Sequence, residues 1–145
     1  MDDAADVPRL LLVTVGGVRF GCRLEDVREV VVGRAAARLP GAEPWVVGLV
    51  NLRGRLLTVL DVARRLGLAP PADGGHVLVV DTGGREAGCR VAAVDRVVPA
   101  PPLAPASNAE AGGIVLGVGE VDGEPVAVLD LPRFVSETLL DPGER

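Results

Sequence analysis

The sequence repeats itself in tandem. Residues 10–17 align with residues 77–84 at an offset of 67, and a Gly-Cys-Arg tripeptide recurs at the same offset. Further along, residues 52–66 align with residues 121–135 at an offset of 69, and both segments contain Val-Leu-Asp. Three matching segments in the same order indicate an internal duplication. The same order of strands and helices, about 67 residues long, is therefore expected to occur twice. This expectation restricts the possible folds more than any other feature of the chain.

Glycine-containing dipeptides mark tight turns between the expected strands. Apolar residues 10–15 end at Gly16-Gly17, and the equivalent run of the second copy ends at Gly83-Gly84. Such dipeptides favour two-residue hairpins, because both residues of the turn need positive φ angles. Asp122-Gly123 predicts a further hairpin, and Gly54 is expected to take a positive φ in a turn that follows Arg53. The sequence therefore predicts structural turns at Gly54, Asp122 and Gly123.

Each copy is expected to finish with a short helix. Asp61 and Asp130 follow the last strand of their copies, where a carboxylate can accept a backbone N–H as an N-cap. The helices should cover 62–67 and 131–140. Short strands followed by a helix predict a mostly β fold of two small five-stranded barrels packed side by side. A barrel of about 67 residues buries little apolar area, so the two should share a hydrophobic seam, with exchange of a terminal element as an option.

A chain of 145 residues, 48% of them hydrophobic, is the size of one ordinary domain with a real core. We expect this domain to span residues 9–138, with pseudo-repeats at about 9–70 and 76–138. The flanking segments 1–8 and 139–145 are expected to be tails.

Charge and composition exclude several classes of function. A net charge of −5, no lysine and only 2% aromatic residues argue against binding nucleic acid, which needs clustered positive charge or stacking platforms. The longest uncharged run, 97–109, contains four prolines and is too short to span a bilayer. We expect 97–113 to be a surface connection within the second copy. Residues 1–9 lack the apolar stretch of a signal peptide, so we expect a cytoplasmic protein.

Residues that could carry chemistry are sparse. His76 is the single histidine and is expected to be an exposed residue at the start of a strand. Cys22 and Cys89 occupy equivalent positions on inward faces, and buried reduced thiols explain them better than a metal site or a disulfide. Neither serine, Ser107 nor Ser136, lies in a nucleophile elbow. We therefore predict a protein that is not an enzyme and that uses no metal and no cofactor.

Residues 44–62 carry the most specific motif. They contain Gly48, Asn51, Leu52, Arg53 and Gly54 in a G-x-x-N-L-R-G pattern, followed by an apolar strand that leads to an aspartate. Upstream, residues 24–30 have an apolar-x-x-V-x-E-apolar pattern and 39–40 are Leu-Pro. From about residue 9 to 138 the chain resembles the CheW-like family. The resemblance implies two SH3-like five-stranded barrels, in agreement with the repeat.

The resemblance also implies a function. CheW-like adaptors couple chemoreceptors (methyl-accepting chemotaxis proteins), bound by their cytoplasmic tips, to the regulatory domain of a CheA-type histidine kinase. Such a protein would be cytoplasmic and recruited to membrane receptor arrays, without inserting into the membrane. The receptor-binding groove implied by the matching positions consists of Val27, Glu29, Val30, Gly48, Asn51, Arg53 and Val94.

One pair of groove residues gives a geometric prediction. In the family the positions of Glu29 and Arg53 are ion-paired beside the receptor groove, so the two side chains should approach within about 4 Å. Arg28 is the competing partner for Glu29, and two separate solvated charges are the alternative. Val27 is expected either to face the receptor or to pack in the core.

Two other functions stay open at this stage. Segment 99–112 has Leu103 as its one large apolar side chain, where relatives place contact residues for ring closure. A CheW-like module of another chemosensory-type pathway, binding only one of the two partners, is therefore the main alternative. An unrecognised hydrolase or a regulatory barrel outside chemotaxis would need a closed pocket lined by titratable groups.

Overall fold

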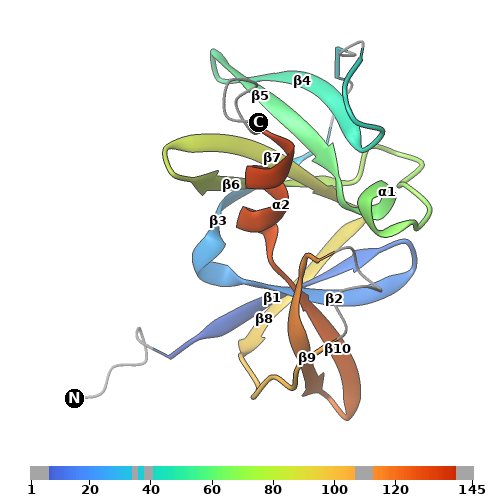
Figure 1. Ribbon diagram of the computed structural model, residues 1–145, viewed down its shortest axis with the longest axis vertical. Helices are drawn as coiled ribbons and strands as arrows, with labels where there is room; N and C mark the ends of the chain where they lie inside the picture. The colour runs from blue at the N-terminus through green and yellow to red at the C-terminus, as the bar shows by residue number, and fades with distance from the viewer. Residues whose placement is uncertain (1–6, 34–35, 38–40, 107–112, 140–145) are drawn as a thin grey trace.

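The computed structural model describes residues 7–33, 36–37, 41–106 and 113–139 and contains two five-stranded sheets, one above the other (Figure 1). The elements in chain order are β1 (Arg9–Val15), β2 (Val18–Arg23), the 3-10 helix η2 (Leu24–Asp26), β3 (Val27–Val32), β4 (Val46–Leu52), β5 (Arg55–Asp61), α1 (Val62–Leu66), β6 (His76–Thr82), β7 (Arg85–Val91), β8 (Ala93–Pro99), β9 (Val115–Val121), β10 (Glu124–Leu129) and α2 (Leu131–Thr138).

The internal duplication is visible in the strands. β1 and β6 start and end at positions related by the offset of 67, and β4 and β9 at positions related by the offset of 69. The lower sheet of Figure 1 has the order β8-β1-β2-β10-β9 and the upper sheet the order β3-β6-β7-β5-β4. Replacing each strand by its equivalent in the other copy converts one order into the other. The prediction that both copies have the same strand order is therefore confirmed.

We expected each copy to form its own barrel, but each sheet contains strands from both copies. Each sheet takes two strands from one copy and three from the other, so the copies exchange their first hairpins. The chain leaves the lower sheet after β2, turns through η2 and enters the upper sheet as β3. Exchange gives both sheets a common core, which a 67-residue barrel alone could not build. Among the described residues the outer strands of each sheet do not pair with each other, so these SH3-like sheets stay open.

The predicted hairpin turns are present. Arg53 and Gly54 have φ angles of 50° and 85°, and Asp122 and Gly123 have φ angles of 54° and 82°. Positive φ at both central residues matches the right-handed twist of the flanking strands. The predicted glycine turns at residues 16–17 and 83–84 likewise have positive φ at both positions.

The main core lies between the two sheets and uses residues of both copies. Its largest fully buried members include Leu60, Leu78, Leu129 and Phe134. Cys22 and Cys89 belong to the same core and are free thiols, as predicted. Burial raises the pKa of Cys22 to about 12 and also raises the pKa of Cys89. Both thiols are therefore protonated and unreactive at neutral pH.

Both predicted helix caps are present. Asp61 accepts a hydrogen bond from the backbone N of Arg64 at 3.1 Å, and Asp130 accepts one from the backbone N of Arg133 at 3.2 Å. The first helix ends at Gly67 in the left-handed conformation. In Figure 1, α2 follows β10 of the lower sheet and then contacts β6 and β7 of the upper sheet. Helix α2 thus joins the two sheets.

Several expectations need correction or lie outside the described residues. His76 does start a strand, but it is half-buried rather than exposed, and no hydrogen-bond partner reaches its enclosed Nδ1. Residues 97–99 belong to β8 instead of a surface connection, because Val98 packs in the core of the lower sheet. Residues 39–40 and Ser107 fall outside the described residues. None of the helices in the described part of the chain is long and apolar enough to cross a membrane.

Candidate functional site

The outer strands of the upper sheet bring Glu29 and Arg53 together. Glu29 lies on β3 and Arg53 lies in the turn after β4, at opposite edges of the sheet order. Arg53 Nη2 donates to Glu29 Oε1 at 2.7 Å and contacts Oε2 as well. The predicted ion pair is therefore confirmed, and it joins the two open edges of the sheet. The competing residue, Arg28, instead pairs with Asp81 at 3.1 Å.

The turn that carries Arg53 is held by its neighbours. Asn51 Oδ1 accepts a hydrogen bond from the backbone N of Gly54 at 2.9 Å. This bond fixes the turn in which Arg53 has a positive φ. The hydrogen bond from Arg53 lowers the pKa of Glu29 and raises the pKa of Arg53, so both groups stay charged at neutral pH.

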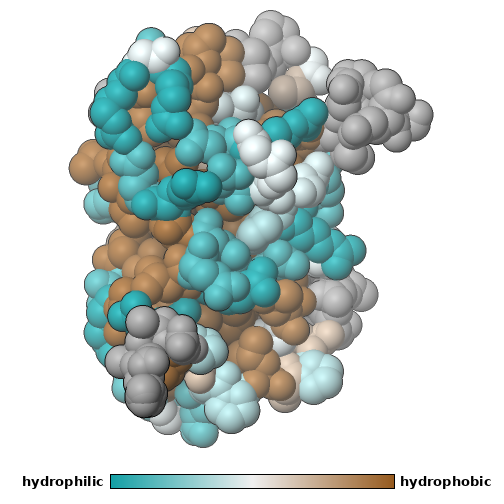
Figure 2. Space-filling view, turned by 90° about the vertical axis from the view of Figure 1, so that its left-hand side faces the viewer, coloured by the Kyte–Doolittle hydropathy of each residue, from teal (hydrophilic) through white to brown (hydrophobic). Residues whose placement is uncertain are grey.

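Four valines of β3 and β8 differ in exposure. Val27 and Val94, equivalent in the two copies, are half-buried and pack against the common core. Val30 is 41% exposed and its equivalent Val97 is 42% exposed. Figure 2 shows hydrophobic surface that continues from the upper half of the molecule to the lower half on this side. Val27 was expected either to face the receptor or to pack in the core. It packs against the core and is also partly exposed to solvent.

Gly48 of β4 acts through its backbone. It has a φ of 147°, and a Cβ placed on it would lie 2.0 Å from the carbonyl oxygen of Ala37. Ala37 pairs with Leu49 through two backbone hydrogen bonds of 2.8 and 2.9 Å and so covers the outer edge of β4. Covering an edge strand prevents unwanted strand pairing. The structure gives Gly48 a packing role, and its contact with a receptor stays a prediction.

The second copy contains the same ion pair with its charges reversed. Arg96 on β8, equivalent to Glu29, pairs with Asp122 in the β9–β10 turn, equivalent to Arg53. Asp122 was expected only as a turn residue. The opposite charges at the two pairs of aligned positions, Glu29 with Arg96 and Arg53 with Asp122, are the sequence signal that would have predicted this second pair. Because the pair recurs in both copies, closing the open sheet edges is a structural role of this pair, independent of any partner.

A second set of ion pairs crosses between the copies and was not predicted. Arg90 Nε donates to Asp61 Oδ2 at 2.9 Å, and the Asp61 side chain is fully buried. The equivalent pair, Arg23 with Asp130, is longer at 3.7 Å and more exposed. Each arginine binds the helix-capping aspartate of the other copy. The repeated Gly-Cys-Arg and Val-Leu-Asp segments contain these residues, but a repeat does not reveal which copy supplies the partner.

The described part of the molecule offers exposed apolar surface for binding at Val30 and Val97. Among residues 7–33, 36–37, 41–106 and 113–139, no group of three or more His, Cys, Asp or Glu side chains is placed to hold a metal ion. A family model described as CheW-like domain matches residues 9–139, nearly the whole chain.

This chain belongs to the CheW-like family.

Two relatives in rhizobia support the family assignment of this CheW-like chain, and one solved structure shares its fold. It is 30% identical over 139 residues to chemotaxis protein CheW of Rhizobium meliloti, an alignment that covers 88% of each chain. It is 34% identical over 73 residues to a probable chemotaxis protein CheW of Rhizobium etli, covering 49% of this chain and 46% of that one. The crystal structure of scaffolding protein TtCheW from Thermoanaerobacter tengcongensis shares the fold, with a TM-score of 0.75 and 23% identity, over 86% of this chain and 85% of that one.

Another similar protein has a different name. The CheW-like chain is 39% identical over 69 residues to protein PilI of Pseudomonas aeruginosa, covering 46% of this chain and 39% of that protein. The alignments to PilI and to the Rhizobium etli protein thus span less than half of those relatives.

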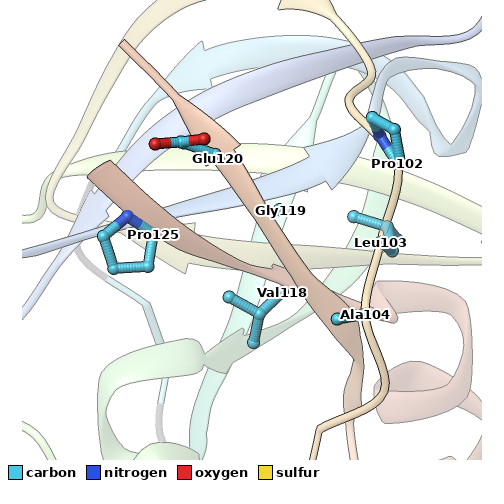
Figure 3. Close-up of a pocket in the computed structure, with 7 residues that line it drawn as sticks. All are labelled: Pro102, Leu103, Ala104, Val118, Gly119, Glu120 and Pro125. Atoms are coloured by element: carbon cyan, nitrogen blue, oxygen red, sulfur yellow. The ribbon is translucent and has the colours of Figure 1, made fainter. Parts of the chain in front are cut away.

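The lower sheet of this CheW-like chain carries an apolar pocket of about 440 Å³. Figure 3 shows Leu103 and Pro102 on one side of it, Val118 of β9 between, and Pro125 on the other side. Glu120 lies at the rim, and Leu103 is exposed. The pocket is open, and Glu120 is the one titratable residue in its lining, unlike a closed catalytic cavity. The described part of segment 99–112, which was expected to be poor in contact residues, therefore contributes an apolar surface through residues 102–104.

Proposed function

We propose that this CheW-like protein is a non-catalytic chemosensory adaptor that couples chemoreceptors to a CheA-type histidine kinase by docking both. The observation that carries the proposal is the presence of two separate exposed apolar surfaces. One lies along β3 of the upper sheet and β8 of the lower sheet, with Val30 and Val97 exposed, and the other is the pocket beside Leu103 and β9 on the lower sheet. An adaptor needs two surfaces that can be occupied together, and contiguous apolar surface marks protein interfaces.

The receptor is proposed to dock at the side of the molecule where β3 and β8 meet the common core. Val27, Val30 and Val94 supply apolar anchors there, which helix-in-groove docking requires. Arg53 is exposed and is oriented by Glu29, so its guanidinium can reach a carboxylate on the receptor tip. In this proposal the ion pair has two roles: it closes the sheet edge and it directs Arg53 toward the receptor.

The kinase regulatory domain is proposed to dock at the pocket on the lower sheet. Leu103, Pro102 and Pro125 offer apolar contact area, and Glu120 at the rim would favour a basic side chain on the kinase. The pocket lies beside β9, at the other end of the lower sheet's strand order from β8 of the proposed receptor surface. We propose that the two surfaces are occupied at the same time. We place the protein in the cytoplasm, recruited to receptor arrays by these contacts.

The receptor surface is tested by titrating a soluble receptor-tip fragment into Arg53→Ala. We expect its affinity to fall on the order of tenfold, as for the loss of a contact of about 1.4 kcal/mol. Arg96→Ala is the matched control, because it breaks the equivalent ion pair on the lower sheet. If both substitutions lowered the receptor affinity equally, the receptor would depend on closure of the sheet edges and not on a contact with Arg53.

A charge swap separates the two roles of the pair. Glu29→Arg combined with Arg53→Glu should fold normally, because Arg96 and Asp122 already hold the reversed pair at the equivalent positions. It should recover more receptor binding than either single substitution does, because the sheet edge is closed again, but it should stay weaker than wild type, because the glutamate placed at position 53 would face the receptor carboxylate. A swap that binds as tightly as wild type would show that edge closure alone matters, and a swap no better than the single variants would show that the reversed pair does not close the edge.

The kinase surface is tested with Leu103→Asp. This exposed side chain can become polar without disturbing the core, so the protein should stay folded. Binding of the kinase regulatory domain should be lost while receptor binding is kept. If wild-type protein captures the receptor tip but no kinase domain, a single-partner module of another chemosensory-type pathway replaces the coupling function.

A further inference from the structure

The two copies hold each other through backbone pairing. In the lower sheet, β10 of the second copy runs parallel to β2 of the first, and β8 pairs with β1. In the upper sheet, β5 of the first copy runs parallel to β7 of the second, and β3 pairs with β6. Four of the strand pairs therefore join the copies. If one copy were removed, each sheet would be left incomplete, with two or three strands.

Buried side chains also cross between the copies. The common core combines Leu11, Val15 and Cys22 of the first copy with Leu78, Cys89 and Phe134 of the second. The buried pair of Asp61 with Arg90 likewise joins the first copy to the second. An apolar core completed by a buried ion pair is what an obligate interface between two protein chains contains.

The covalent connection between the copies is, by contrast, short and peripheral. Leu68 is fixed next to Gly16, since a Cβ on Gly16 would lie 2.5 Å from the Cβ of Leu68. Gly75 accepts a hydrogen bond from Gly33 N at 2.9 Å. Between these two anchors, residues 69–73 are mostly exposed and belong to no strand or helix. Asp73 Oδ1 accepts a hydrogen bond from the backbone N of Gly75 at 3.1 Å, which holds the second anchor and does not join the copies. Between the copies the connection therefore adds proximity, equivalent to an effective concentration on the order of millimolar.

We propose that the two copies form an exchangeable non-covalent pair, in which residues 69–73 are only a tether and the first half of one molecule can bind the second half of another. The partner recognised by each half is thus the complementary half of this chain. The protein behaves as an obligate heterodimer whose subunits happen to be joined.

The test starts from the folded full-length chain with a protease site in place of residues 69–73. After complete cleavage, the halves should elute together at the volume of the uncut protein and keep its circular dichroism. The unfolding midpoint should rise with protein concentration only after cleavage, because unfolding then separates two molecules. Cut samples with and without ¹⁵N labelling, mixed in urea and refolded, should give hybrid masses in native mass spectrometry.

Two substitutions show whether the observed seam holds the halves. In the cut protein, Arg90→Met should weaken the association of the halves at least about tenfold, because Arg90 and Asp61 then belong to separate molecules. Arg53→Ala should leave it unchanged within about twofold, because Arg53 and Glu29 lie in the same half. Halves that separate after cleavage, whether folded or unfolded, overturn the proposal, and so does refolding without hybrids.

Discussion

Replacing Arg90 by Met should be more damaging than the same replacement at Arg23. Asp61 is 0% exposed and loses its guanidinium partner in Arg90→Met, while the methionine still fills the space of the aliphatic stem. One oxygen of Asp61 keeps its hydrogen bond from the backbone N of Arg64, so the helix cap survives. The substitution therefore isolates the cost of a buried carboxylate without its countercharge.

The expected magnitudes follow from burial. Removing one partner of a buried ion pair costs about 3–5 kcal/mol, and Arg90 is 16% exposed, which places this loss near roughly 3 kcal/mol. For Arg23→Met the carboxylate of Asp130 is 20% exposed and already 3.7 Å from the guanidinium. Arg23 Nε also donates to Asp26 at 2.9 Å, a local pair three residues away whose carboxylate is 12% exposed. Because Arg23 is itself 39% exposed and both of its carboxylate partners keep some contact with water, the loss should be smaller than for Arg90→Met, about 1–2 kcal/mol.

The assay is urea unfolding followed by circular dichroism and by the fluorescence of Trp45, the single tryptophan, whose Nε1 donates to Thr138 Oγ1 of α2 at 3.0 Å. Both variants remove one positive charge from a chain of net charge −5, so the general charge effect cancels in the comparison. Adding Asp61→Asn to Arg90→Met should recover part of the loss, because the amide still caps the helix without a buried charge. Losses that agree within about 0.5 kcal/mol for Arg90→Met and Arg23→Met would refute the reasoning.

Three further outcomes are expected. Gly48→Ala should cost more stability than Gly54→Ala, because only the first places a Cβ against a backbone oxygen, at 2.0 Å from Ala37, while the second has open space and pays about 1–2 kcal/mol of left-handed strain. Equal urea midpoints for the two variants would contradict this. The stability advantage of wild type over Glu29→Gln should be complete above pH 4.5, the ordinary Glu pKa, and should disappear as pH falls through the lowered pKa of the folded state. A difference that grows on acidification would exclude the ion pair as its source. Cys22 and Cys89 should react with a thiol reagent only at the rate of unfolding, because burial raises their pKa values; fast labelling of native protein would show that the core opens locally.

Local signals in the sequence determined the elements of this protein. The hairpin at Asp122-Gly123, the caps at Asp61 and Asp130 and the inward-facing cysteines each depend on residues within a few positions of one another. Such features are set by backbone sterics and side-chain alternation, which act before any tertiary contact forms. The tandem alignment then required both copies to have the same order of elements. The pair of Glu29 and Arg53 came from the resemblance to the CheW-like family.

The tertiary structure alone decided which strands became neighbours. β2 has the same alternating pattern whether it pairs with β5 of its own copy or with β10 of the other, so the sequence could not distinguish contiguous barrels from exchanged ones. The same ambiguity concealed the pairing of Asp61 with Arg90, because each copy contains both residue types at equivalent positions. Exchange of the first hairpins stabilises the folded state because it unites two small cores into one larger core. The stabilisation comes from apolar area buried between residues that are distant in the sequence, which local patterns do not reveal.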